Sequence, residues 1–212
     1  MPYTVVTDAA SEPISLTEAK LHLKVDFSAD DNEITILIKA ARQAVEQYTN
    51  LALLPKTIDE VFDEFPQACR QKNPFGAFSL TVSPVSSVTS ITYTKTDETS
   101  TTVAASVYDV DTTTARARIA PKVNQYWPTD VYLGLSPITV RYVAGYADTT
   151  ALPAPLRHAM LLTIGHWYRN REDTVRTMPT QAAWLLNKYR VERKSTRLNS
   201  SHGNLSRKTS SD

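Results

Sequence analysis

The sequence predicts an α+β fold: a small helical bundle of two N-terminal and two C-terminal helices, with a β-rich insertion between them. Apolar residues recur every three to four positions in residues 15–49 and again in residues 154–190, as in amphipathic helices. Between these segments, residues 57–146 are rich in Thr, Val, Tyr, Ser and Pro, and their apolar residues alternate in short runs. The length suits one domain with a sizeable insertion, which we assign to residues 1–191.

Both N-terminal helices have local start signals. Ser15 and Glu18 form a capping box, from which a short helix is expected to run to about Leu23. The acidic stretch before Asp31 interrupts the pattern and begins a second helix, which ends near Thr49. The positions expected to face inward are Leu16, Ala19, Leu21 and Leu23 in the first helix and Ile34, Leu37, Ile38, Ala41, Val45 and Tyr48 in the second.

Six strands are expected in the insertion, separated by turns that contain Pro, Gly or Asp. The clearest is the last, because Ile138, Val140 and Tyr142 alternate with polar residues and share one face. The expected strands are residues 58–65, 78–82, 88–94, 107–110, 117–119 and 138–144.

Helical periodicity resumes after Pro155. Its apolar stripe comprises Leu156, Met160, Ile164, Trp167 and Tyr168, and we expect Gly165 to allow the close approach of another backbone. A last helix is expected from Thr180 to about Arg190. Aromatic residues and arginine are enriched at protein interfaces, so five residues near these helices are candidates for an interface with another protein chain. They are Trp167, Tyr168, Arg169, Arg171 and Trp184.

The sequence shows no catalytic, metal or cofactor site that we would assign. No glycine-rich phosphate loop occurs, and Cys69 lies in a polar stretch. His158 and His166 are eight residues apart with no ligand between them, which favours packing histidines over a metal site. The acidic run from Asp59 to Glu64 is interpreted as alternation along a half-exposed strand. We therefore expect neither enzymatic activity nor a cofactor.

The sign of the net charge changes at about residue 191. Residues 192–212 contain five basic and two acidic residues, which leaves 18 basic and 20 acidic residues elsewhere, a net charge of −2. We expect this tail to be disordered. Lys194 to His202 is also what AAGAGCACACGTCTGAACTCCAGTCAC encodes, a string that resembles a sequencing adapter, so the native C-terminus is expected to be missing. Neither a signal peptide nor a membrane span is expected.

Several segments, in this order and spacing, resemble a family of tailed-phage proteins. They are residues 14–26, 30–34, 40–42, 48–49, 83–93, 108–111, 140–146, 152–159 and 165–172. The chain is similar to gp6-like head–tail connector, or head-completion, proteins, in the phiE125 gp8-like branch.

The resemblance implies a virion structural protein of the neck, made in the host bacterial cytoplasm. It also implies a ring of identical subunits, typically twelve, under the portal protein. Such a ring extends the DNA channel without binding DNA specifically and receives a downstream neck or tail protein. The family brings no catalytic residues.

Two other classes of function compete with this reading. A DNA-packaging accessory protein would contact DNA directly, but it needs a basic surface that residues 1–191 do not supply. A small hydrolase or metal-dependent enzyme would need His158, His166 or the acidic pairs to meet in one pocket.

Overall fold

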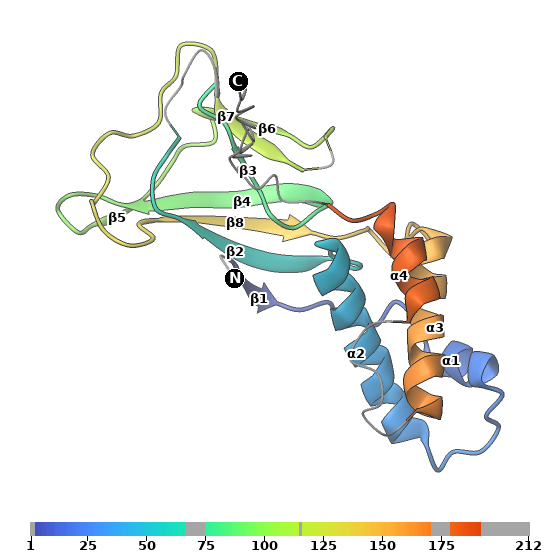
Figure 1. The fold of residues 1–212 in the computed structure, drawn as a ribbon. Helices are drawn as coiled ribbons and strands as arrows, with labels where there is room; N and C mark the ends of the chain where they lie inside the picture. The colour runs from blue at the N-terminus through green and yellow to red at the C-terminus, as the bar shows by residue number, and fades with distance from the viewer. Residues whose placement is uncertain (1–2, 67–74, 115, 171–178, 192–212) are drawn as a thin grey trace, which may run out of the picture.

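The computed structural model describes residues 3–66, 75–114, 116–170 and 179–191. Within them the chain forms four helices and two antiparallel sheets, which confirms the predicted α+β fold class (Figure 1). The helices are α1 (Leu16–Leu23), α2 (Asp31–Thr49), α3 (Ala154–Arg169) and α4 (Thr180–Asn187). They lie together at one end of the larger sheet. The predicted tail, with its adapter-like stretch, and Cys69 lie outside the described residues.

The larger sheet has the strand order β1-β2-β8-β4-β5. Its strands are β1 (Tyr3–Thr7), β2 (Lys56–Phe62), β8 (Ile138–Ala144), β4 (Val85–Thr94) and β5 (Ser100–Thr102). A second sheet, ordered β3-β7-β6, is formed by β3 (Phe78–Ser79), β7 (Arg118–Pro121) and β6 (Tyr108–Asp111).

Helices α1 and α2 and strands β4 and β8 end where the sequence predicted, whereas several other bounds differ. The inward placement of Leu21 is wrong, because its side chain is 80% exposed on the outer side of α1. The last helix was predicted to reach Arg190 but ends at Asn187. Beyond it, Tyr189 N–H bonds to Leu186 O in a tighter turn, and Val191 N–H bonds to Thr49 O, which draws the chain toward α2. The predicted strand 78–82 shrinks to β3, because beyond Leu80 the N–H groups of Thr81 and Val82 bond to the side chains of Glu60 and Tyr142 and not to a neighbouring strand. Strands β1 and β5 were not predicted.

The molecule has two hydrophobic cores, one for each part. The helical core joins α2, α3 and α4 and consists mostly of aliphatic and small side chains, including Ile34, Ile38, Val45, Leu156, Met160, Ile164, Ala182 and Leu186. The core of the β-rich part is aromatic as well as aliphatic. There Phe65 stacks on Trp127 with ring centroids 4.8 Å apart, and the Trp127 indole donates to Gly76 O at 2.8 Å.

A buried ionic cluster connects the two parts. Arg42 of α2 is only 2% exposed. Its guanidinium donates two bonds of 2.9 Å to Asp8 after β1 and one of 2.8 Å to Glu12, and lies 3.6 Å from Glu46. Glu46 also pairs with Lys56 of β2 at 2.7 Å. The bond from Arg42 holds the pKa of Asp8 at about 2, below its ordinary value of 3.8.

Gly145 forms a second joint where β8 leads toward α3. Its φ of +133° is one that side-chain-bearing residues rarely adopt. A Cβ atom there would lie 2.2 Å from Leu54 O, so the two backbones approach too closely for any other residue.

The interpretation of the acidic run is wrong for Glu60. Asp59 faces outward and forms a bidentate pair with Arg141, but Glu60 is buried on the opposite face of β2. Its carboxylate accepts bonds from Thr81 N–H at 2.9 Å, from the Thr81 hydroxyl and from the Tyr142 hydroxyl at 2.9 Å. Burial, and then the neighbouring Glu60 charge, raise the pKa of Tyr142.

Candidate functional site

The five predicted interface residues fall into three groups. Trp184 of α4 is 75% exposed, because it lies opposite the buried Ala182 and Leu186. Arg169 is exposed at the end of α3. Arg171 lies outside the described residues.

The other two predicted residues, Trp167 and Tyr168, are half-buried against the helical core. The Tyr168 hydroxyl donates to Asp30 Oδ2 at 2.5 Å and holds the end of α3 beside the start of α2. These two aromatics therefore contribute mainly to packing within the subunit.

Trp184 borders a groove between α3 and α4. This α3–α4 groove has a volume of about 480 Å³ and is lined by His158, Leu162, Thr180, Gln181, Trp184 and Leu185. The sequence analysis had not placed Leu162 or Gln181 at an interface. Their signal was weak, since each lies beside a helical apolar stripe.

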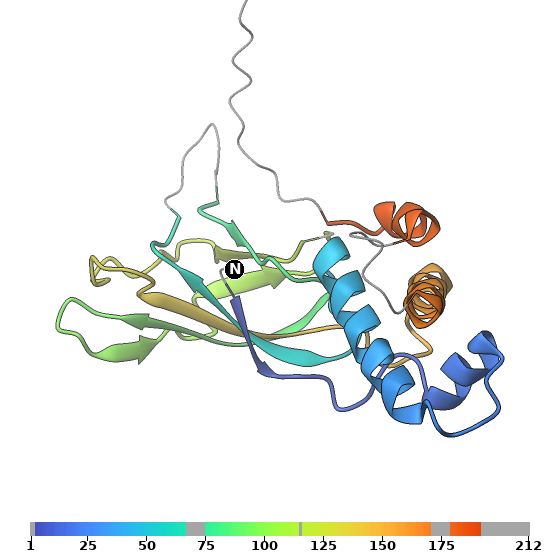
Figure 2. The same ribbon diagram turned by 60° about the horizontal axis from the view of Figure 1, so that its bottom comes forward.

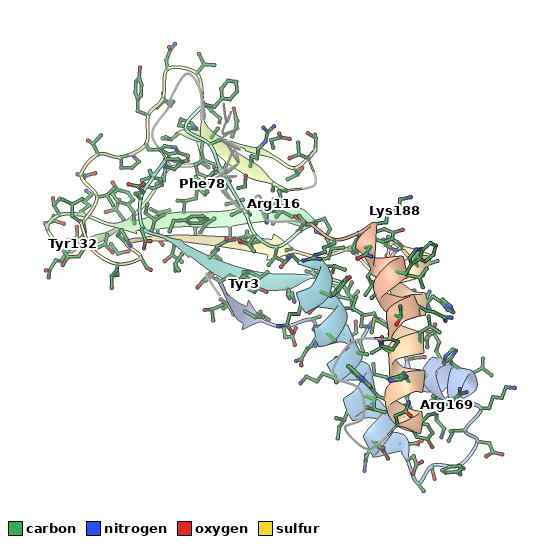
Figure 3. All side chains as sticks on the ribbon, in the orientation of Figure 1. Tyr3, Phe78, Arg116, Tyr132, Arg169 and Lys188 are labelled. Atoms are coloured by element: carbon green, nitrogen blue, oxygen red, sulfur yellow. The ribbon has the colours of Figure 1, made fainter. Side chains whose placement is uncertain are left out.

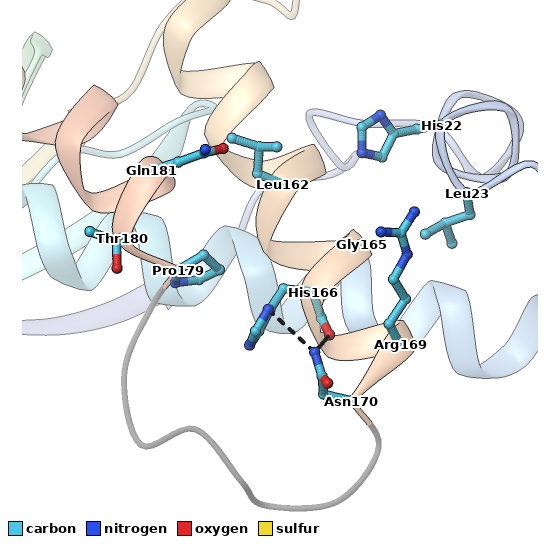
Figure 4. A pocket seen from close by; sticks show the side chains of 10 residues that line it. All are labelled: His22, Leu23, Leu162, Gly165, His166, Arg169, Asn170, Pro179, Thr180 and Gln181. Carbon is cyan, nitrogen blue, oxygen red and sulfur yellow. Dashed lines mark hydrogen bonds between the residues drawn. The ribbon is translucent and has the colours of Figure 1, made fainter.

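A second hollow continues from this groove toward α1 (Figure 4). It measures about 660 Å³, and Leu162, Thr180 and Gln181 border both spaces. Among the residues that the structure describes, the lining side chains include His22, His166 and Arg169 and no carboxylate. The combined surface is thus apolar along α3 and α4 and basic toward the end of α3.

The prediction for Gly165 is wrong. The atoms nearest to a Cβ at this position belong to the side chains of His22, at 3.4 Å, and Leu23. Gly165 therefore meets the side chains of α1, not a close backbone.

The structure also shows where the histidines lie that an enzyme or a metal site would need. His158 lines the α3–α4 groove and His166 lines the second hollow. No group of three potential metal ligands comes together within the described ranges. In the same ranges, none of the helices has the length and hydropathy of a membrane span.

A second uncovered apolar surface lies at the opposite end of the molecule. In the loop before β8, Leu133 is 99% and Leu135 95% exposed. The loop is nevertheless held in place, because Tyr132 N–H bonds to Thr94 O at 2.9 Å and Ser136 N–H bonds to Asp63 at 3.0 Å. Figure 3 labels Tyr132 in this region and Arg169 at the far end of the helices. The sequence analysis did not identify this leucine loop.

Comparison with solved structures shows the same fold in assembled particles. A chain in a structure titled as the neck of an empty gene transfer agent particle, computed with C6 symmetry, is 23% identical and has a TM-score of 0.75. A chain from the virion of the native particle is 24% identical with a TM-score of 0.75. A third, from the native neck with C12 symmetry, is 22% identical with a TM-score of 0.73. Each match covers 92% of this chain and 98% of the other.

The comparison with curated proteins gives no match. The family model described as phage gp6-like head–tail connector protein matches residues 13–126, more than half of the chain. This match spans both N-terminal helices and most of the β-rich part. The chain belongs to the gp6-like head–tail connector family and is a structural protein of the virion that connects head and tail.

Proposed function

We propose that the chain acts as an adaptor ring in the neck of the virion. The ring lies under the portal protein, extends the DNA channel and receives the next neck or tail protein. The observation that carries this proposal is the family match, and the similar chains from particle necks with C6 or C12 symmetry support the ring. A ring of about twelve copies is the expected form, as in the C12 neck.

The α3–α4 groove fits this role as a contact surface. Trp184 is exposed beside Leu162 and Leu185, and exposed tryptophans frequently dominate the free energy of protein association. The proposed interface therefore keeps Trp184 and Arg169 from the predicted set. It replaces Trp167 and Tyr168 with residues that line the groove.

The proposed role requires no catalysis. Glu60, the buried carboxylate of the β-rich part, is occupied by bonds from Thr81 and Tyr142. His158 and His166 lie eight residues apart on α3, about 12 Å along the helix. Each side-chain group that suggested an enzyme thus has a packing or surface role.

The ring proposal is tested by the mass of the full chain in solution. Light scattering would be recorded alone and after mixing with the portal protein of the same phage. We expect a closed oligomer, with assembly promoted by the portal. A chain that remains monomeric in both conditions and does not bind the portal would contradict the proposal.

A DNA-packaging accessory protein is the second candidate. Residues 1–191 have a net charge of −2, and retention of DNA needs clusters of Lys and Arg on the surface. We therefore expect no tight binding of duplex DNA at physiological salt. Fluorescence anisotropy with a labelled duplex tests this, and tight binding by the oligomer would favour the accessory protein.

A further inference from the structure

The chain before α1 forms a segment that lies on the surface of the subunit. Residues 3–12, which we call the N-terminal strap, comprise β1 and the turn after it, and none of their side chains is buried. Figure 2 shows β1 at the outer edge of the larger sheet, with the chain running from it toward α2. Pro13 and Ile14, which follow, are buried, and Ile14 belongs to the helical core. The strap is therefore a surface segment that is fixed at one end.

The groups that hold the strap are buried, in contrast to the strap itself. Arg42 is 2% exposed, and its guanidinium donates to the carboxylates of Asp8 at 2.9 Å and Glu12 at 2.8 Å. Strand β2 pairs with β1 in a register that places Val5 opposite Ile58, a fully buried residue. We call Arg42 and the β2 edge that β1 covers the strap site.

The strap site recognises an extended segment that carries two carboxylates. The edge of a β-strand pairs with an extended backbone, because its N–H and C=O groups otherwise have no partners in the sheet. Arg42 adds a requirement for two carboxylates four residues apart, the spacing of Asp8 and Glu12. Apolar burial contributes little, since the side chains of the strap stay at the surface. A second copy of the chain carries a segment with this chemistry and this spacing.

The strap can leave its site without unfolding of the subunit. Segments that bury little apolar surface open locally, at free energies well below that of global unfolding. Arg42 also keeps a carboxylate nearby when the strap is absent, because its Nη1 lies 3.6 Å from Glu46 Oε2. The Glu46 side chain is itself only 10% exposed, so it stays beside Arg42 in both states. The buried cation is therefore not left unpaired.

Assembly into a ring brings straps and strap sites of different copies together. Each copy has the same neighbour in the same orientation, and linkage within one assembly raises the effective concentration of a weak ligand. A strap that crosses to the next copy forms the same bonds to β2 and Arg42 as the strap that it replaces. Exchange of identical elements between copies is thus limited to a change of conformation at the hinge before Pro13.

We propose that the N-terminal strap of one copy occupies the strap site of a neighbouring copy in the assembled ring. Residues 11–13 act as the hinge, pairing with β2 sets the register, and Arg42 binds the two carboxylates of the incoming strap. In an isolated subunit the same site holds the chain's own strap. The inference rests on the proposed ring and gives it a link between copies through an exchanged strand.

Disulfide formation between two different variants tests the exchange. Cys69→Ser removes the single cysteine of the full chain, and Thr7→Cys is then introduced in one variant and Thr57→Cys in the other. These residues are paired across β1 and β2, within the roughly 7 Å between Cα atoms that a disulfide needs. The variants are mixed as subunits, assembled with the portal protein and mildly oxidised. The matched control replaces Thr57→Cys with Leu133→Cys, a 99% exposed position, and we expect the mixed disulfide at about tenfold above it.

Two further mixtures test the role of the carboxylates. Asp8→Asn with Glu12→Gln weakens the bonds to Arg42 and leaves the pairing with β2. In the Thr57→Cys variant these changes weaken the strap that must be displaced, so the mixed disulfide should increase. In the Thr7→Cys variant they weaken the incoming strap, so it should decrease. We expect the two yields to differ by about tenfold, since hydrogen bonds between charged groups are among the strong ones. Circular dichroism checks that each variant is folded, and equal yields would overturn binding through Arg42.

Failure of the exchange can be distinguished from failure of the ring. If light scattering shows rings but the mixed disulfide stays at the level of the control, each strap remains in its own subunit. The exchange is then wrong and the ring stands. A chain that stays monomeric, alone and with the portal protein, and gives no mixed disulfide contradicts both proposals.

Discussion

The helical bundle and the β-rich part bury charge in different ways. In the β-rich part, Glu60 lies inside the fold and is satisfied by hydroxyl and amide donors from β8 and from the segment after β3. In the bundle, the buried charge is Arg42, at the border with the sheet, where its partners come from other segments. Glu60 is therefore satisfied within the β-rich part, whereas the charges at the border, Arg42 and Lys56, are paired with carboxylates from other segments.

Removal of the Arg42 charge should lower the free energy of unfolding more than any other change proposed below. Arg42→Met leaves the carboxylates of Asp8 and Glu12 without their cation in a partly buried site. We expect the free energy of unfolding to fall by about 3 kcal/mol, the low end for loss of one partner of a buried ion pair, because the side chains of Asp8 and Glu12 are partly exposed. Urea denaturation measures it. Arg42→Lys, which keeps the charge but not the bidentate geometry, should lie between the two, and equal stability of all three would refute a structural role for the cluster.

The second joint is tested by Gly145→Ala. The methyl group would meet the Leu54 carbonyl, and the φ of +133° would strain the backbone. Such strain costs about 1–3 kcal/mol. The matched control is Gly134→Ala in the exposed loop, where the new Cβ meets only the Tyr132 side chain, which can move. Similar thermal stability of both variants would show that the joint is not constrained.

Tyr142→Phe tests the internal charge of the β-rich part. It removes one of the donors to Glu60 and leaves those from Thr81. The expected loss is about 1–2 kcal/mol in urea denaturation, because a buried carboxylate retains only part of its hydrogen bonding. A loss of stability as large as that of Arg42→Met would show that the buried charges of the two parts do not differ in their contribution.

The border cluster should also respond to acid. The pKa of Asp8 is about 2 in the folded chain and 3.8 ordinarily, so its contribution is complete above about pH 4 and is lost as the pH falls toward 2. Its side chain is 45% exposed, and solvent screening reduces the effect to about 1 kcal/mol. Between pH 5 and pH 2, the free energy of unfolding should fall less steeply for Asp8→Asn than for the parent chain. An equal slope would show that Asp8 does not cause the sensitivity to acid.

The smallest change in stability is expected at the leucine loop. Leu133→Ser with Leu135→Ser alters side chains that are almost wholly exposed, so the free energy of unfolding should stay within about 0.5 kcal/mol. Thermal unfolding checks this. A large loss would mean that the loop is part of the core of the β-rich part.

The sequence predicted those elements whose pattern is local. Helix α2 has acidic residues in its first turn and a regular apolar period, and β8 alternates along its length, so both were located to the residue. Strands β1 and β5 lie at the edges of the sheet, and their mostly exposed side chains produce no alternation to detect. Pattern alone therefore identifies elements that have one buried face.

The sites depend on residues that are distant in sequence. Arg42 falls on the inner side of α2, but its partner Asp8 lies 34 residues away. Glu60 is bound by Tyr142, 82 residues further along. For the proposed interface, amino-acid type made Trp184 a candidate. Only the packing of α3 against α4 showed that Leu162 lies beside it and that Trp167 turns inward.

The exposed leucine loop has a further consequence in a symmetric assembly. One loop offers two leucines, too little apolar area for tight binding by itself. A closed ring repeats the loop around one circle, and linked weak contacts can raise the overall affinity by about 10²–10⁴. A tail component that binds these leucine loops would bind single subunits only weakly and the finished ring tightly. Avidity alone would then set the order of assembly.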